Sequence, residues 1–271
     1  PGQVVARGPR VVHTRDVQAR GSPLHHHPPV AQHRQPLRRD LGEQLARLDD
    51  QAKALNSSGA NFLFACWQTL LWRLTAQPEI IAGKLFEGRK YDELEGAFGL
   101  FVTRIPIVGH FAESSLFSDV LKQLSDATSD ASAWQEYFNW EDEPSTDNSI
   151  GFDYEERPQS LICNGVSFTL FDQYFCGDRF KIKLNCVRKA DSLALEFHYD
   201  ANVFDAAYVK TIAGQFLTLV QSAAGNPKTP VSKLEILTPA DRIQLLSDFN
   251  STGNAYPHQK CIFELFEEQA A

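Results

Sequence analysis

The chain has 271 residues, of which 43% are hydrophobic and 22% charged, and its formal net charge is −8. This apolar content suffices for a sizeable core and excludes a wholly disordered protein. The net acidity argues against a nucleic-acid-binding protein, because phosphate contacts require clustered Lys and Arg. No run approaches about 18 consecutive apolar residues, and the N-terminus lacks a secretory pattern. We therefore expect no membrane span and a cytoplasmic location.

The first 36 residues differ in composition from the rest. Residues 1–40 hold seven Arg and two Asp but neither Lys nor Glu. We expect an unstructured basic tail over 1–36, which is either a genuine linker or a wrongly read frame. The run His25-His26-His27 could bind a metal, but it has no Cys or carboxylate partner nearby, so a solvated tail is the preferred interpretation and no metal site is expected.

Two helices are predicted next. An apolar stripe interrupted by charged residues indicates the first, formed by Leu41, Leu45, Leu48, Ala52 and Leu55. Residues 56–59 (Asn-Ser-Ser-Gly) end this helix and can cap a second one over 60–74. The second helix is apolar on nearly every face and too short to cross a membrane, which predicts a central core helix.

Two strands and a third helix follow. Residues 78–83 predict a short buried strand, and residues 101–108 predict another, in which Pro106 indicates an edge or a bulge. Ser114 or Ser115 is expected to open the third helix. Its predicted apolar stripe comprises Leu116, Val120, Leu121, Leu124, Ala127, Ala131 and Trp134.

The second half of the chain begins with a polar loop at 141–149 and continues mainly as strands. Residues 166–176 predict one strand. Alternation of apolar and polar residues predicts a pair of half-buried strands at 180–186 and 193–199. A long helix over 206–224 follows, which Asp205 can cap.

These elements together predict an α/β layered domain over residues 37–227. Residues 228–256 are expected to form a linker with one short helix at 239–249. The last residues, 257–271, are expected to begin a further domain.

None of the common catalytic motifs is present. The chain lacks the glycine-rich phosphate loops of nucleotide-binding proteins and the G-x-S-x-G of α/β-hydrolases. His110 and His198 have no acid or nucleophile at motif spacing, and the strand pattern places His198 on the surface. The five Cys form no CxxC pair, so we expect most of them to be small buried hydrophobic residues.

Residues 60–109 resemble the C-terminal lobe of the condensation domain of nonribosomal peptide synthetases. That family shows an apolar helix ending in LLxRxTGQ, a strand DIVVG, a polar loop with Gly-Arg or Asn-Arg, and then GxFVNTLPLR. The same order runs here through Trp72–Thr75, Glu79–Gly83, Gly88-Arg89 and Gly99–Pro106. The family's HQDxPFE segment aligns with 134–140, and residues 230–271 resemble the linker into an adenylation domain with that domain's first helix.

The resemblance implies a two-lobed fold like that of chloramphenicol acetyltransferase, of which this chain holds one lobe. Donor and acceptor would arrive as thioesters on phosphopantetheine arms of carrier domains and meet in a tunnel between the lobes, where an amine attacks a thioester to form an amide. No cofactor is expected to bind this chain directly. The implied partners are carrier domains, the missing N-terminal lobe and the adenylation domain, with no nucleic acid and no membrane.

The family's catalytic motif, HHxxxDG, belongs to the N-terminal lobe and has no counterpart here. If His26-His27 is taken as the pair, Ala31 and Gln32 stand where Asp and Gly should be. The resemblance therefore implies that this chain carries no catalytic residue and is inactive alone.

Two positions depart from the family within the lobe that shapes the tunnel. Thr103 replaces the Asn of FVNT, and Trp134 replaces the His of HQD. Gly99, Thr103, Trp134 and Gln135 are therefore the candidate residues of the substrate tunnel or the lobe interface. Turn and strand geometry, or core packing for Trp134, would explain the same residues without a functional role.

The main functional expectation is thus a fragment of a condensation domain that forms amide bonds within a nonribosomal peptide synthetase. An alternative is a non-catalytic docking module of a biosynthetic megasynthase, because a lone lobe would expose the apolar surface that normally faces its partner lobe. A third possibility is a stand-alone acyltransferase that uses a histidine of the 25–27 run.

Overall fold

The computed structural model describes residues 37–41, 44–94, 96–99, 101–138, 149–157, 161–169, 180–189, 192–253 and 261–270. The predicted tail at 1–36 and its histidine run lie outside these residues, as does nearly all of the loop at 141–149. The chain divides into two compact units between Ile236 and Leu237, which is later than the domain end predicted at residue 227.

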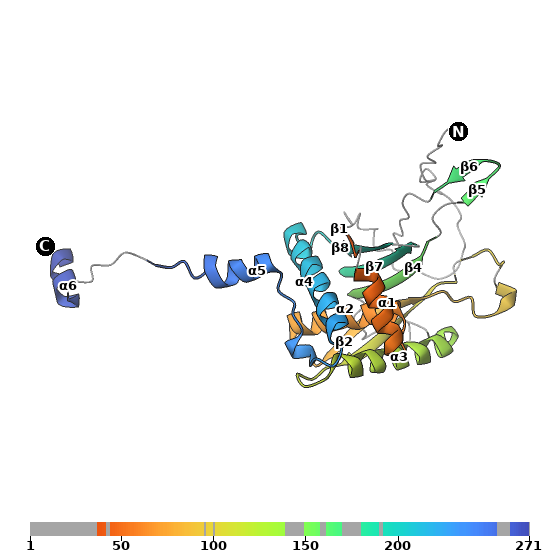
Figure 1. Ribbon diagram of the computed structural model, residues 1–271, viewed down its shortest axis with the longest axis horizontal. Helices are drawn as coiled ribbons and strands as arrows, with labels where there is room; N and C mark the ends of the chain where they lie inside the picture. Colours follow the sequence, from red (N-terminus) through yellow and green to blue (C-terminus); the bar gives the residue numbers. More distant parts are fainter. Residues whose placement is uncertain are drawn as a thin grey trace, which may run out of the picture. The chain divides into compact units, whose positions relative to one another are not determined.

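The first unit is built on a six-stranded sheet (Figure 1). Its strands, in the order of the sheet, are β1 (Leu37–Asp40), β8 (Ser192–Tyr199), β7 (Ile182–Lys189), β4 (Ile150–Glu156), β2 (Glu79–Phe86) and β3 (Thr103–His110). β4 runs parallel to β7 and β2, and the other described pairs are antiparallel. The α/β layered fold expected from the sequence is confirmed.

The predicted strands correspond closely to β2, β3, β7 and β8. β3 lies at the edge of the sheet, which explains why Pro106 is tolerated there without an amide hydrogen. β1 and β4 are not predicted. In β4, Ile150, Phe152 and Tyr154 share one face, but they alternate with Gly151, Asp153 and Glu155 in a short acidic segment.

The strand predicted at 166–176 is confirmed at its start, where it forms one arm of a separate hairpin. β6 (Val166–Phe168) pairs with β5 (Leu161–Cys163), and residues 170–179 lie outside the described part of the chain. Asn164 and Gly165 connect the two strands, with φ of 48° and 78°. Two successive positive φ angles are what a tight two-residue hairpin turn requires.

Four helices cover one face of the sheet: α1 (Gln44–Ala54), α2 (Gly59–Thr75), α3 (Phe117–Trp134) and α4 (Ala206–Gly225). α2 is buried at every position from Phe62 to Trp72, which confirms the predicted central core helix. Trp67 of α2 packs edge-on against Phe197 of β8 and Phe216 of α4, with ring centroids 6.1 Å apart in both pairs. These contacts join helix, sheet and neighbouring helix in one core.

The helix caps divide into two kinds. Ser58 and Asp205 accept hydrogen bonds from the amides of Asn61 and Tyr208, at 3.1 and 2.7 Å, so the predicted caps of α2 and α4 are confirmed. α3 begins at Phe117 rather than at Ser114 or Ser115, and no side chain caps it.

Backbone carbonyls of a distant segment satisfy the first turn of α3 instead. The amides of Phe117 and Ser118 donate to the carbonyls of Thr229 and Pro227, at 3.1 and 2.9 Å. Arg73 of α2 adds hydrogen bonds to the carbonyls of Val231 and Leu234. Residues 227–236 are therefore bound to the sheet-and-helix unit.

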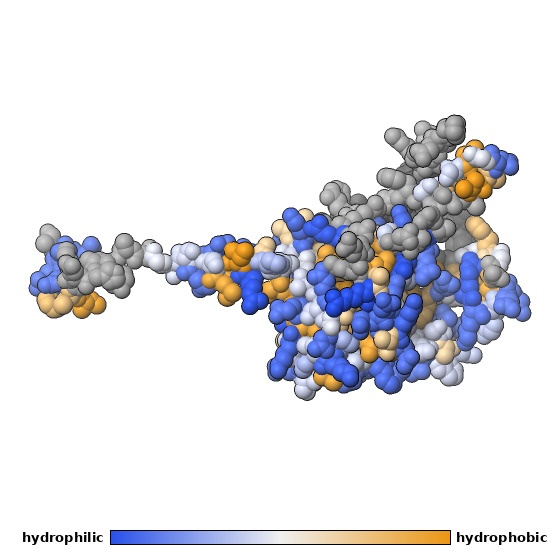
Figure 2. All heavy atoms as spheres, in the orientation of Figure 1, coloured by the Kyte–Doolittle hydropathy of each residue, from blue (hydrophilic) through white to orange (hydrophobic). Residues whose placement is uncertain are grey.

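In the second unit, the structure describes two short helical segments. α5 (Pro239–Ile243) continues into a single π-helical turn at 244–248, and α6 spans Ile262–Ala270. Thr238 and Asp241 form a reciprocal capping box at the start of α5. Both helices expose large apolar side chains (Figure 2), namely Ile243, Leu246, Phe249, Ile262, Phe263 and Phe266.

The expectation about His198 is wrong, and the one about the cysteines is confirmed in part. The side chain of His198 is only 13% exposed and lies 3.5 Å from Glu196, so it is not a surface histidine. Cys66 and Cys186 are buried as expected, Cys163 and Cys261 are exposed, and Cys176 lies outside the described residues. Burial raises the pKa of both buried thiols well above its ordinary value, which keeps them protonated. Within the described ranges, no helix has the length and apolar character to cross a membrane.

Candidate functional site

The turn that follows β2 is built around Gly88, whose φ is +68°. A Cβ atom at this position would lie 1.7 Å from the carbonyl oxygen of Phe101, so only glycine fits. This close approach brings the start of the turn against the segment that leads into β3.

Arg89, the next residue, holds that segment through its guanidinium group. Nη1 donates to the carbonyl oxygens of Leu94 and Ala97, at 2.5 and 2.8 Å, and Nη2 donates to that of Gly99 at 3.3 Å. The guanidinium carbon also lies 4.4 Å from the centre of the Phe101 ring. One side chain therefore fixes three carbonyls and one aromatic ring of residues 94–101.

Gln135 reaches the same turn from the end of α3. It begins the short 3-10 helix η2 (Gln135–Tyr137) and is buried. Its Oε1 accepts a hydrogen bond from the amide of Gly88 at 3.2 Å, and its Nε2 donates to the carbonyl of Ser132 at 3.1 Å. The side-chain amide thus ties the end of α3 to the Gly88-Arg89 turn.

Three of the four candidate residues are therefore linked. Gly99 accepts from Arg89, Gln135 accepts from Gly88, and Thr103 begins β3 opposite Phe86, the last residue of β2. The hydroxyl of Thr103 is 3.4 Å from the carbonyl oxygen of Phe101.

Trp134 lies beside this group but is not part of the core. Its side chain is 67% exposed, so the sequence-based stripe is wrong at this position. Its ring contacts that of Tyr137, which is 77% exposed, with centroids 5.7 Å apart. Nearby, Tyr91 donates a hydrogen bond to Glu136 at 2.9 Å, and this bond raises the pKa of the Tyr91 phenol.

The sheet face opposite the helices carries a charged network that the sequence analysis missed. Asp153 of β4 accepts from Arg104 of β3 and from Lys183 of β7, both at 2.9 Å, and the three side chains are nearly buried. A Cβ at Gly83 would lie 3.0 Å from Arg104, and one at Gly151 would lie 2.9 Å from Lys183. The two glycines therefore leave room for both long side chains to lie across the sheet.

The network continues toward β8. Asn185 donates to Glu155 at 3.0 Å and to Glu196 at 3.3 Å. The alternating pattern of residues 180–186 predicted a strand with one exposed face, yet Lys183 and Asn185 are only 7% and 9% exposed. Period-2 alternation shows which residues share a face but not whether that face is covered, so it gave no signal for this network.

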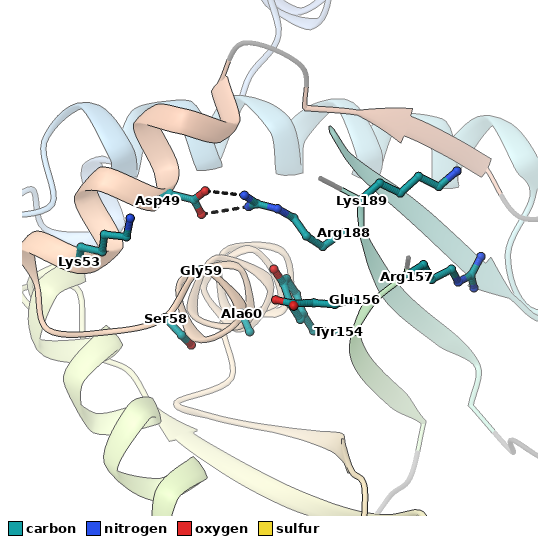
Figure 3. A pocket seen from close by; sticks show the side chains of 10 residues that line it. All are labelled: Asp49, Lys53, Ser58, Gly59, Ala60, Tyr154, Glu156, Arg157, Arg188 and Lys189. Atoms are coloured by element: carbon teal, nitrogen blue, oxygen red, sulfur yellow. Dashed lines mark hydrogen bonds and ion pairs between the residues drawn. The ribbon is translucent and has the colours of Figure 1, made fainter. Parts of the chain in front are cut away.

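A polar cavity of about 590 Å³ lies where β4 and β7 end, beside the first turn of α2 (Figure 3). Asp49 and Lys53 of α1 line it, together with Tyr154, Glu156 and Arg188 at the strand ends. Asp49 and Arg188 bind each other across it by two hydrogen bonds. None of the four sequence-predicted residues lines this cavity.

Gly99, Thr103 and Gln135 can shape a surface, and the Gly99 carbonyl and the Gln135 side-chain amide already have partners within the fold. Carbonyls, one hydroxyl and one amide form this surface, and these groups neither take up nor release a proton near neutral pH. These residues therefore do not form an acid–base pair. In the described part of the chain, no three His, Cys, Asp or Glu residues come together to hold a metal ion.

Comparison with known families decides the class of the protein. A family model described as "Condensation domain" matches residues 30–246. The chain belongs to the condensation domain family. Its sheet and covering helices are therefore those of a condensation-domain fold.

Relatives of this condensation-domain chain are nonribosomal peptide synthetases. It is 24% identical to gramicidin S synthase 2 of Brevibacillus brevis over 243 residues, which cover 85% of the chain and 5% of that synthetase. The first condensation domain of the CDA synthetase has a similar structure, with a TM-score of 0.63 and 17% identity over 75% of the chain and 48% of that domain.

A crystal structure of a four-domain nonribosomal peptide synthetase bound to AMP and glycine is also similar. Its TM-score is 0.74 at 15% identity, over 87% of this chain and 20% of that protein. The chain therefore spans about half of the solved condensation domain and a small part of the complete synthetases.

Proposed function

We propose that this chain is the C-terminal lobe of a condensation domain, followed by the linker into an adenylation domain. The observation that carries the proposal is the family match over 30–246 combined with coverage of only 48% of a solved condensation domain. The order of the resembling segments, from the core helix through Gly99–Pro106 to residues 134–140, supports assignment to the C-terminal lobe.

The proposed reaction is acyl transfer between two carrier domains. The amine of the acceptor attacks the carbonyl carbon of the donor thioester, the carbon–sulfur bond breaks, and an amide and a free phosphopantetheine thiol result. The amine loses one proton, which a base must take up and the thiolate can receive. This chain would contribute tunnel wall and positioning, and the HHxxxDG motif of an N-terminal lobe would contribute the histidine.

Complementation between two lobes tests the proposal. The full chain is mixed with a separately expressed N-terminal lobe that carries HHxxxDG, together with carrier domains loaded with a donor acyl group and an acceptor amino acid. Amide product, measured by mass spectrometry on the acceptor carrier, is expected only when both lobes are present. A lobe with the second histidine of the motif replaced by Ala is the matched control.

A non-catalytic docking module is the second candidate. The exposed aromatic residues Trp134 and Tyr137 favour it, because monomeric proteins seldom leave such side chains together in solvent. If the two lobes form a stable complex in gel filtration without giving product under any loading, docking becomes the better description. If they neither associate nor react, both candidates fail.

A further inference from the structure

The Gly88-Arg89 turn connects two parts of the chain that are far apart in sequence. Arg89 binds the carbonyls of Leu94, Ala97 and Gly99 on one side. The amide of the preceding residue, Gly88, binds Gln135 on the other. Both candidate segments, the one entering β3 and the one at the end of α3, are therefore held by two adjacent residues.

The geometry at Arg89 depends on the shape of a guanidinium group. A planar fork can donate to several carbonyls at once while its face lies on an aromatic ring, here that of Phe101 at 4.4 Å. A lysine ammonium is a single point on a flexible stem and cannot make the three bonds and the ring contact together. Residues 94–101 contain two glycines, Gly96 and Gly99, so this segment has little conformational preference of its own.

Lys90, the cationic residue next to Arg89, makes different contacts. Lys90 points to the end of α3, where its Nζ donates to the carbonyl of Ala133 at 3.0 Å and lies 3.8 Å from Glu136. It contacts α3 rather than the segment that Arg89 holds. Lys90 therefore provides a matched control, because its replacement removes the same charge one residue away.

We propose that Arg89 is a positioning residue for acyl transfer: it fixes Leu94, Ala97, Gly99 and Phe101 so that Gly99 and Thr103 present the tunnel wall in register with Gln135. This inference rests on the function proposed above. Arg89 itself does not touch the reacting atoms, because its guanidinium is occupied by the carbonyls and the ring that it holds.

The first test uses the full chain alone. Hydrogen exchange is compared for the wild-type protein, Arg89→Ala, Arg89→Lys and Lys90→Gln. In Arg89→Ala, amides of residues 96–103 are expected to exchange about tenfold faster or more, while those of the buried part of α2 keep their rates. Arg89→Lys should fall between, and Lys90→Gln should match the wild type in this segment. Unchanged exchange at 96–103 in Arg89→Ala would overturn the proposal.

The second test uses the same four proteins in the two-lobe transfer assay. A misplaced wall should lower kcat by about tenfold to a hundredfold and leave the KM for the donor carrier within about twofold, because carrier docking is untouched. If Arg89 only stabilises the fold, the decrease in kcat should instead be proportional to the decrease in the fraction of folded protein. If exchange rises but kcat does not fall, Arg89 has no positioning role. If the wild-type chain gives no product, the proposed function itself fails, whereas the exchange result still decides whether Arg89 holds the segment.

Discussion

Asp49 of α1 and Arg188 at the end of β7 form a two-point ion pair, with Nη1–Oδ1 and Nη2–Oδ2 distances of 3.1 and 2.8 Å. Their side chains are 25% and 24% exposed, so water screens the pair only in part. The hydrogen bonds to Asp49 raise the pKa of the Arg188 guanidinium. The pair attaches α1 to the sheet at the edge of the polar cavity.

Asp49→Asn is expected to lower the free energy of unfolding by about 1–2 kcal/mol, because it removes the charge from a paired carboxylate while keeping its size. Urea denaturation followed by circular dichroism measures the change. Asp126→Asn is the control, since the Lys122–Asp126 pair is solvent-exposed and should matter by less than about 0.5 kcal/mol. Equal changes in the free energy of unfolding for the two variants would show that the Asp49–Arg188 pair stabilises the protein no more than an exposed pair does.

Lys84 predicts a dependence of stability on pH. Its side chain is buried between α2 and α3, its Nζ donates to Asn61 at 2.7 Å, and desolvation lowers its pKa to about 8. The unfolded chain holds this proton up to about pH 10.4, so between pH 8 and that value the unfolded state binds more protons than the folded state. The contribution of Lys84 to the free energy of unfolding should therefore rise with pH in this window, by about 3 kcal/mol at most.

Lys84→Met should remove this rise, because the side chain no longer titrates. Unfolding curves at pH 7 and pH 9.5 for wild type, Lys84→Met and the exposed-site control Lys53→Met isolate the effect. As the pH increases, the free energy of unfolding of the wild type should rise relative to that of Lys84→Met. If the free energy of unfolding changes with pH by the same amount in all three proteins, Lys84 does not have a lowered pKa in the folded state.

Gly88→Ala is expected to destabilise the protein by about 2 kcal/mol or more. The new Cβ would meet the carbonyl of Phe101 and the backbone would keep a positive φ that Ala disfavours. Gly96→Ala is the matched control, because no atom lies within 4 Å of a Cβ there. Thermal unfolding should show a clear decrease in Tm only for Gly88→Ala, and similar Tm values for both variants would refute the close approach.

The two tryptophans Trp67 and Trp134 should respond in opposite ways to replacement by Ala. Trp67 is fully buried, so its loss should cost about 3–5 kcal/mol. Trp134 is largely exposed, so its loss should change the free energy of unfolding by less than about 0.5 kcal/mol. If urea denaturation shows a large loss of stability for Trp134→Ala, Trp134 is a core residue, as the sequence pattern predicted.

Periodicity predicted the parts of the fold that depend on one buried face. The largely apolar α2, the capped α4 and the edge strand with Pro106 follow directly from local rules that the structure obeys. β4 was not predicted because its central carboxylate, Asp153, is stabilised by Arg104 and Lys183, which lie on other strands. When the partner of a charged residue is far away in sequence, the segment that holds the charge has the composition of a surface loop.

The candidate site was predictable in its members but not in its connections. Family resemblance selected Gly99, Thr103 and Gln135, yet no local pattern indicated that Gly88 and Arg89 join them. A glycine followed by an arginine is common on protein surfaces. The structural role of this pair becomes visible only from the positions of Phe101 and the three carbonyls. Trp134 was placed in the core because its spacing continues the stripe of α3, whereas the helix ends there and leaves the ring in solvent.

The dependence of α3 on the carbonyls of Pro227 and Thr229 has a consequence for synthesis on the ribosome. The amides of Phe117 and Ser118 emerge long before the residues that satisfy them, with β4, β7, β8 and α4 made in between. The first turn of α3 can therefore be completed only when almost the whole lobe has left the exit tunnel. A release of the chain after Gly225 would yield every strand of the sheet and still leave the first turn of α3, the helix that packs on the edge strand β3, without its hydrogen-bond acceptors.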